Sequence, residues 1–181
     1  DLEHPCQALA DFLTMQEHFG TLKDQTITYI GDGNNVANSL MICGAILGVN
    51  VRISSPKGFA PNKSIVEKAQ FIAGSDSIIN ISTDPLESVE GANAIYTDVW
   101  ASMGQEEEQI VREKAFKGFC LNNEMLQLAD KDAIVLHCLP AHRGQEITED
   151  VIESPSSRIF DQAENRLHIQ QALLAALLGG L

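Results

Sequence analysis

The amino-acid sequence predicts an α/β protein, a single domain built on an open, doubly wound sheet of about five parallel strands with helices on both faces. Short apolar runs alternate with helical patterns along the whole chain, which is typical of β-α-β units around a parallel sheet. The chain has 181 residues, of which 44% are hydrophobic. That length and composition suffice for one buried core and give no indication of a second.

Five predicted strands are nearly continuous apolar runs, as expected where helices cover both faces of a strand. They span residues 26–31, 51–56, 77–82, 94–100 and 133–139. In such a Rossmann-like sheet, ligands bind beyond the carboxyl ends of the strands, at the point where the strand order reverses. We therefore expect the functional loops to start near Gly31, Pro56, Ser82, Asp98 and His137.

Helices are predicted for residues 5–19, 35–47, 62–73, 85–89, 106–117, 123–129 and 162–178. Gly20 is a plausible end for the first of them, since glycine readily adopts the left-handed conformation that closes a helix. The last helix carries an apolar run, Leu167 to Leu178, that is wider than one core-facing stripe. We expect part of it to pack against something outside this chain.

Charge and cysteine content narrow the class of protein. With 25 acidic and 12 basic residues, the net charge of -13 disfavours nucleic acid and anionic membranes as partners. No run approaches the roughly 18 apolar residues of a membrane span, and the first residues lack a signal peptide. The four cysteines (Cys6, Cys43, Cys120, Cys138) form no CxxC pair, which favours a reducing compartment and a cytoplasmic location. Because the chain starts without methionine, we expect a fragment of a longer protein.

The loop after the first strand, residues 31–36, reads GDGNNV and begins like a dinucleotide-binding fingerprint. Val36 replaces the third glycine, and the second strand, VRISSP, ends without the acidic residue that would hold a ribose. Both departures argue against NAD. Two interpretations stay open: a helix N-terminus that binds an anion, or Asn34 and Asn35 acting only as helix caps.

Two further strand ends carry polar groups. Residues 98–104 read DVWASMG, in which Asp98 could pair with an ammonium while Ser102 and nearby N–H groups bind a carboxylate; a merely capping role is the alternative. Residues 137–140 read HCLP, in which Cys138 is either a catalytic thiol or a buried structural one. No further metal ligands follow at zinc spacing, so we expect no metal.

The opening helix begins HPCQ, which places His4 and Gln7 three residues apart on one helical face. Both side chains could bind a carbonyl-containing group, although a histidine before Pro5 is also an ordinary way to start a helix. Each of these signals is weak when taken alone.

Together and in this order, the motifs resemble those of the ornithine carbamoyltransferases, within the aspartate/ornithine carbamoyltransferase family. The resemblance rests on HPCQ with LAD after it, GDGNN, DVWASMGQEEE, HCLP and AENR (residues 163–166), and it spans essentially the whole chain. It implies the second, ornithine-binding domain of a two-domain enzyme. The Ser-x-Arg-Thr phosphate motif of the first, carbamoyl-phosphate-binding domain does not occur here.

The resemblance implies a role for each matching residue. The catalytic group would comprise His4, which stabilises negative charge on the carbamoyl oxygen, Gln7, which orients the carbamoyl amine, Arg166, which contacts carbamoyl phosphate, and Cys138 beside the attacking amine. The substrate-binding group would comprise Asn35, Asp98, Ser102, Met103 and the carbonyl of Leu139. Cofactors and metals are not implied.

The complete enzyme would convert carbamoyl phosphate and L-ornithine to L-citrulline and phosphate in arginine biosynthesis, as a homotrimer. With the N-terminal domain missing, we expect the chain alone to be inactive. A carbamoyltransferase for putrescine or N-acetylornithine is one alternative. A non-catalytic nucleotide- or small-molecule-binding module on the same fold is the other, because fold alone does not define function.

Overall fold

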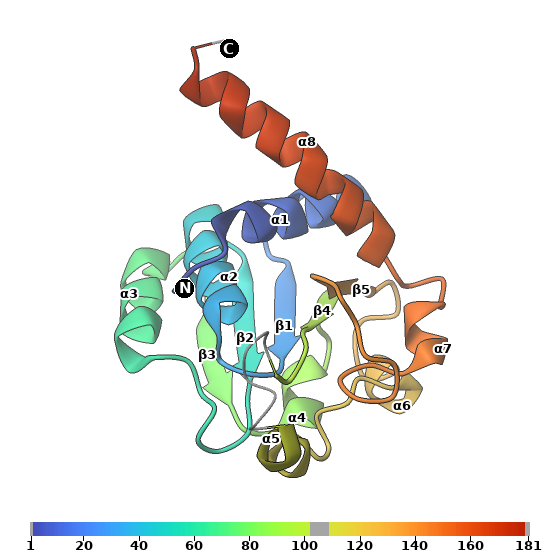
Figure 1. The fold of residues 1–181 in the computed structure, drawn as a ribbon. Helices are drawn as coiled ribbons and strands as arrows, with labels where there is room; N and C mark the ends of the chain where they lie inside the picture. Colours follow the sequence, from blue (N-terminus) through green and yellow to red (C-terminus); the bar gives the residue numbers. More distant parts are fainter. Residues whose placement is uncertain (1, 102–108, 180–181) are drawn as a thin grey trace.

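A computed structural model describes residues 2–101 and 109–179, which form one five-stranded sheet in the order β3-β2-β1-β4-β5 (Figure 1). Every neighbouring pair is parallel. The strands are β1 (Thr26–Ile30), β2 (Asn50–Ser54), β3 (Ile79–Ser82), β4 (Ala94–Thr97) and β5 (Ile134–His137). The predicted parallel α/β sheet is thus confirmed, and the strand order reverses between β1 and β4.

The helices alternate with the strands, as the sequence predicts. They are α1 (Pro5–Phe19), α2 (Asn35–Leu47), α3 (Lys63–Ala73), α4 (Pro85–Val89), α5 (Gln109–Ala115), α6 (Asn123–Leu126), α7 (Glu149–Ile152) and α8 (Ile159–Leu177). Helix α1 ends at Gly20, whose φ of 74° is left-handed, as predicted. The short α7 was not predicted, α6 is shorter than predicted, and α8 begins three residues earlier. The first part of the predicted helix 106–117 lies outside the described residues.

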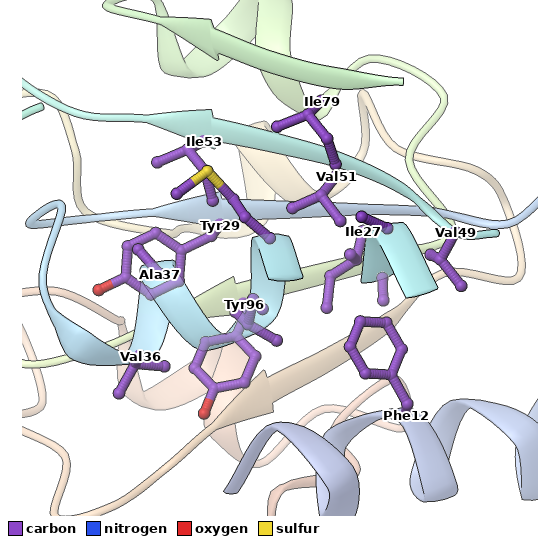
Figure 2. Close-up of a cluster of buried hydrophobic side chains, with 14 of the residues drawn as sticks. Phe12, Ile27, Tyr29, Val36, Ala37, Val49, Val51, Ile53, Ile79 and Tyr96 are labelled. Carbon is purple, nitrogen blue, oxygen red and sulfur yellow. The ribbon is translucent and has the colours of Figure 1, made fainter. Parts of the chain in front are cut away.

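Alternate residues of the strands contribute side chains to two apolar layers, one on each face of the sheet. On one face, Ile27 and Tyr29 of β1 and Tyr96 of β4 pack with side chains of α1, α2 and α3 (Figure 2). On the other face, Ile95 of β4 and Val135 of β5 pack with residues from α4, α6, α7 and the segment after α5. Because both faces are covered, β1, β4 and β5 are buried along their whole length, whereas β2 and β3 carry the partly buried Arg52 and the exposed Asn80 between apolar residues.

Helix α8 packs across α1, and its C-terminal half extends beyond the rest of the molecule (Figure 1). Only Ile159, Gln162 and Asn165 of this helix are buried. The apolar side chains of the second half are largely exposed, including Leu174 at 58% and Leu177 at 74%. That they pack on something outside this chain stays a prediction. Within the described ranges, no helix has both the length and the apolarity to cross a membrane.

Gly33 in the loop after β1 is required for close packing. Its backbone N–H donates to the carbonyl of Phe59 at 2.8 Å. A Cβ at this position would lie 2.2 Å from the backbone nitrogen of Pro61, far inside van der Waals contact. The glycine therefore lets the β1–α2 loop lie directly against the segment that follows β2.

Gly33→Ala should lower the free energy of unfolding by about 1–3 kcal/mol, because the clash is with backbone and the loop must shift. Urea denaturation would measure the change. Lys68→Ala, on the exposed surface of α3, is the control and should change stability by less than about 0.5 kcal/mol. A Gly33→Ala protein as stable as the control would show that the loop accommodates the methyl group.

Candidate functional site

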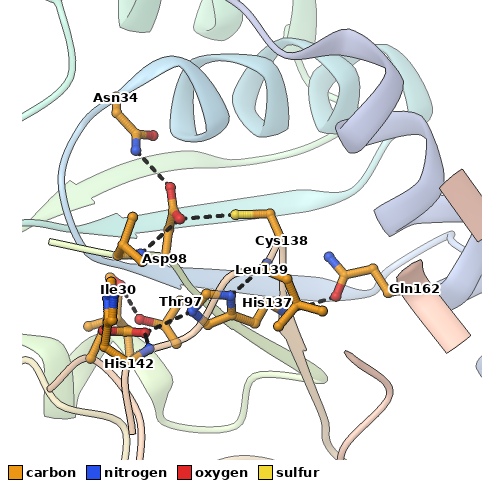
Figure 3. A network of polar contacts seen from close by, with 11 residues as sticks. Ile30, Asn34, Thr97, Asp98, His137, Cys138, Leu139, His142 and Gln162 are labelled. Atoms are coloured by element: carbon orange, nitrogen blue, oxygen red, sulfur yellow. Dashed lines mark hydrogen bonds and ion pairs between the residues drawn. The ribbon is translucent and has the colours of Figure 1, made fainter. Parts of the chain in front are cut away.

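Asp98, directly after β4, is the centre of a polar cluster at the carboxyl ends of the strands (Figure 3). Its Oδ2 accepts a hydrogen bond from Asn34 Nδ2 at 2.8 Å. Its Oδ1 accepts from Cys138 Sγ at 3.0 Å and from the Val99 backbone N–H at 2.8 Å. The residue is only 6% exposed, so residues that follow β1, β4 and β5 meet around one buried carboxylate.

The loop after β1 supplies Asn34 rather than Asn35 to this cluster. The Asn34 side-chain oxygen accepts from the backbone N–H groups of Val36 and Ala37 and so caps α2, while its nitrogen binds Asp98. Asn35 is the first residue of α2, and its side chain has no hydrogen-bond partner among the described residues. The capping interpretation is thus right for Asn34 and wrong for Asn35. Two of the N–H groups at this helix start are already satisfied, which weakens the case for an anion site there.

Cys138 is a hydrogen-bond donor in this arrangement. Burial raises the pKa of its thiol well above the ordinary value, and the negative charge of Asp98 raises it further. The thiol therefore keeps its proton at neutral pH and directs it at the carboxylate. In this state it orients Asp98 and does not accept a proton.

An ion pair holds the loop after β4 against the loop after β1. Arg112 of α5 contacts Asp32 Oδ2 at 2.6 Å and donates to the Trp100 carbonyl at 2.8 Å. Its guanidinium also lies over the ring of Phe59, 5.1 Å from the ring centre. Burial raises the pKa of Asp32, and the adjacent Arg112 partly offsets the effect. This contact fixes Trp100, two residues beyond Asp98.

His4, Gln7 and Arg166 lie together where α8 crosses α1. Arg166 donates from a guanidinium nitrogen to Gln7 Oε1 at 2.6 Å. Burial lowers the pKa of His4, Arg166 lowers it further, and Asp98 acts in the opposite direction. The imidazole is therefore neutral at pH 7, so it can donate one N–H without carrying charge. Because both Arg166 and Asp98 affect the pKa of His4, these three groups lie within electrostatic range of one another.

Asp11, one turn after Gln7 on α1, is fully buried between α1 and α8. Its Oδ1 accepts from Gln7 Nε2 at 2.7 Å and from Gln162 Nε2 at 2.6 Å. The oxygen of the Gln162 amide accepts the backbone N–H of His137 at 2.8 Å. Helix α1, helix α8 and strand β5 are thus joined through one carboxylate.

The HCLP segment forms a turn at the end of β5 that is held by hydrogen bonds of the His137 ring. His137 Nδ1 accepts the backbone N–H of Leu139 at 2.9 Å, so the proton is on Nε2, which lies 3.1 Å from Glu146 Oε1 (Figure 3). The side chains of His137 and Glu146 are both fully buried. Leu139 has a φ of 53°, a left-handed conformation that is rare for leucine. The imidazole holds this residue in place.

The structure brings together most of the residues that the sequence predicts. His4, Gln7 and Arg166 form one group, Asp98 and Cys138 a second, and Leu139 follows directly after Cys138. Ser102 and Met103 lie outside the described residues. Sequence reasoning missed Asn34 as a partner of Asp98, gave Asp11 no role although it ends the LAD motif, and missed Gln162. A signal existed for Asp11, which lies among the apolar residues Ala8, Ala10 and Phe12 of α1, but not for Gln162, because two of the three buried residues of α8 are polar.

Comparison with known proteins identifies the family. A family model described as "Aspartate/ornithine carbamoyltransferase, Asp/Orn binding domain" matches residues 23–177. The chain belongs to this family. A curated ornithine carbamoyltransferase of Prochlorococcus marinus (strain MIT 9313) is 65% identical over 181 residues, which is 100% of this chain and 57% of the relative. One from Trichormus variabilis is 57% identical over 179 residues. The chain therefore spans little more than half the length of the curated relatives it matches.

Solved structures of the family confirm the fold. The ornithine carbamoyltransferase of Pyrococcus furiosus superposes with a TM-score of 0.95 at 49% identity, covering 100% of this chain and 58% of that one. The enzyme from Gloeobacter violaceus gives a TM-score of 0.91 at 47% identity, with 98% and 59% covered. The family resemblance predicted from the motifs is thus confirmed, and so is the fold.

The protonation of Asp11 should make stability pH-dependent. Burial raises the pKa of this carboxyl from 3.8 to about 7, opposed by the amides of Gln7 and Gln162 and by Arg166. Among the described residues, Tyr96 of β4, Cys43 of α2 and Cys138 are the other titratable groups that interact with it. Between pH 4 and 7 the folded state therefore binds the proton that the unfolded state has lost, so this group's contribution to stability falls as pH rises.

We expect the unfolding free energy of the wild type minus that of Asp11→Asn to fall by about 3 kcal/mol between pH 4.5 and 7.5. Chemical denaturation of both proteins across this range measures the difference. Asp76→Asn, at an exposed position, should give a nearly constant difference and serves as the control. A constant difference for Asp11→Asn as well would mean that Asp11 is ionised throughout.

Proposed function

We propose that this chain is the ornithine-binding half of an ornithine carbamoyltransferase. The complete enzyme transfers the carbamoyl group of carbamoyl phosphate to the side-chain amine of L-ornithine, giving L-citrulline and phosphate for arginine biosynthesis. The curated relatives, at up to 65% identity over the full chain, carry this name. Because the chain spans 57% of that relative, the proposal includes a further domain that binds carbamoyl phosphate.

One observation carries the choice of an amino acid as ligand. The Asp98 carboxylate is buried, is held by three neutral donors, and has no cationic side chain within ion-pair distance among residues 2–101 and 109–179. A buried anion without a counter-charge is costly, and an ammonium group is the ligand that offsets the cost. The α-amino group of ornithine supplies that charge, and Ser102 and Met103 bind its head group from the same loop.

Most of the remaining residues act on carbamoyl phosphate and its carbamoyl group. Neutral His4 donates an N–H to the carbamoyl oxygen, where negative charge grows as the amine attacks. Gln7 Oε1 and the Leu139 carbonyl accept hydrogen bonds from the carbamoyl amine, and the Arg166 guanidinium contacts carbamoyl phosphate. Asn35 contributes to ornithine binding at the start of α2.

Cys138 acts through its proton in this scheme. The ornithine side chain, with an ordinary pKa of about 10.4, must lose a proton before it attacks, and a desolvated site favours its neutral form. The S–H group fixes Asp98 and borders the path of that amine. The thiolate needed for a proton acceptor is disfavoured by burial and by Asp98.

The chain alone is proposed to be inactive, because half of the contacts to carbamoyl phosphate and the closure between domains are missing. The complete enzyme is proposed to be a cytoplasmic homotrimer that requires no cofactor or metal. Putrescine and N-acetylornithine are alternative acceptors, but neither presents the free zwitterionic head group that Asp98 and its loop are suited to bind.

The proposal is tested with an enzyme in which this chain replaces the corresponding 57% of the Prochlorococcus marinus relative, here termed the joined enzyme. It should form citrulline from ornithine, and carbamoylate putrescine at least about 100-fold less efficiently, whereas the chain alone should form none.

Asp98→Asn should raise the KM for ornithine by about 30-fold or more, since a buried charge pair is lost. Asp76→Asn should leave the KM unchanged. A joined enzyme that prefers putrescine, or an Asp98→Asn variant with normal ornithine affinity, would refute the assignment.

Replacement of Cys138 tests the role of the thiol proton. In the joined enzyme, Cys138→Ser should weaken ornithine binding about tenfold and shift the pH profile of kcat/KM, because a shorter donor changes how Asp98 is held. Steady-state kinetics from pH 6 to 10 provide both readouts. Cys120→Ser, outside the Asp98 cluster, is the matched control. Unchanged affinity together with an unchanged profile would remove Cys138 from the mechanism.

A further inference from the structure

The carboxyl group of Asp11 occupies an unusual position for a charged residue in the interior. It has no exposed surface and lies between α1 and α8, four residues after Gln7. Two different glutamine side chains, Gln7 and Gln162, donate to the same oxygen at 2.7 and 2.6 Å. No salt bridge to this carboxylate is found among the described residues. Its contacts are therefore directional hydrogen bonds and not ion pairing.

These contacts leave one orientation for the Gln7 amide. A carboxylate oxygen can only accept, so the nitrogen of Gln7 must face Asp11. On its other side Gln7 contacts the Arg166 guanidinium, which can only donate, so the oxygen must face Arg166 at 2.6 Å. Reversal of the amide would place donor against donor and acceptor against acceptor. The oxygen of Gln7 is thereby presented toward Arg166 and the reaction site.

Gln162 is constrained in the same way. Its nitrogen faces the Asp11 carboxylate, and its oxygen accepts the backbone N–H of His137 at 2.8 Å. His137 in turn accepts the backbone N–H of Leu139 on its ring nitrogen. An unbroken chain of hydrogen bonds thus connects Gln7, on α1, to Leu139, at the end of β5, and Asp11 is its central acceptor.

We infer that Asp11 is a positioning residue, which fixes the Gln7 amide with its oxygen toward the carbamoyl group and, through Gln162 and His137, sets the Leu139 turn relative to it. The inference rests on the proposed function, in which Gln7 and Leu139 both accept from the carbamoyl amine. The planar carbamoyl amine has two N–H groups and needs two acceptors at fixed positions relative to one another. Asp11 is connected by hydrogen bonds to the residues that carry both acceptors, directly to Gln7 and through Gln162 and His137 to Leu139.

The second oxygen of Asp11 supports this role. In the part of the chain that the structure describes, Oδ2 is buried without a hydrogen-bond partner, and burial raises the pKa of the carboxyl to about 7. When the group is protonated, the proton can reside on Oδ2 while Oδ1 continues to accept from both glutamines. The orientation of Gln7 therefore persists in both protonation states. What the site requires of Asp11 is an acceptor at Oδ1, and not a negative charge.

A double-mutant cycle in the joined enzyme separates this role from general stabilisation. Asp11→Leu removes the acceptor at similar volume and should lower kcat by about 10- to 100-fold, while the ornithine KM changes less than threefold. Gln7→Leu should have a similar effect. If Asp11 acts through Gln7, the double variant should be no more than threefold slower than Gln7→Leu, because coupled residues are non-additive. Asp11→Asn, which keeps an acceptor oxygen, should retain kcat within threefold.

The outcomes are distinct. If the joined wild type forms no citrulline, the proposed function fails; if it is active and Asp11→Leu keeps full kcat, only the inference fails. Multiplicative losses in the double variant, or a loss in Asp11→Asn as large as that in Gln7→Leu, would also overturn the inference. Asp11→Ala covers the case in which leucine prevents folding, and thermal unfolding of each variant confirms that kinetics are read on folded protein.

Discussion

The reversal of strand order between β1 and β4 is the constraint on which the site depends. Because β1 pairs in parallel with both β2 and β4, the connections from β1 and β4 leave in opposite directions, and the loops that follow them start side by side at the carboxyl ends of the strands. Asn34, Asp98 and Cys138 follow three adjacent strands and meet there within hydrogen-bond distance. The order and direction of the strands thus determine where the polar side chains of the site lie.

Two buried carboxylates near these strand ends have different surroundings. Asp98 receives three hydrogen bonds spread over both oxygens, an environment suited to holding a negative charge and awaiting a cation. From residues 2–101 and 109–179, Asp11 receives two on one oxygen and none on the other, an environment suited to orienting its donors. Neutral His4 and cationic Arg166 lie between them. In a protein of net charge -13, the Arg166 guanidinium thus lies beside Gln7 where α8 crosses α1.

The sequence predicts the features that depend on local pattern and misses those that depend on distant contact. Asp98 and Cys138 could be found because they end apolar strands of a parallel sheet. The choice between Asn34 and Asn35 required the helix start to within one residue, which pattern alone does not resolve. Asp11 and Gln162 are 151 residues apart, and their contact follows only from the packing of α8 on α1. The role of Gly33 likewise depends on Pro61, which only the folded loop brings near.

The polar character of the α1–α8 interface fixes how the two helices can slide. Gln162 binds Asp11, and Asn165 binds both Thr14 and Glu17 across the same contact. An apolar seam could slip by one helical turn, about 5.4 Å, and exchange one set of contacts for another. Here the same slip would leave several buried groups unpaired, at about 1–3 kcal/mol each. These contacts therefore hold the long terminal helix α8 in a single register on α1. A displacement of its exposed C-terminal half then affects the site through tilting of α8 and not through sliding of α8 along α1.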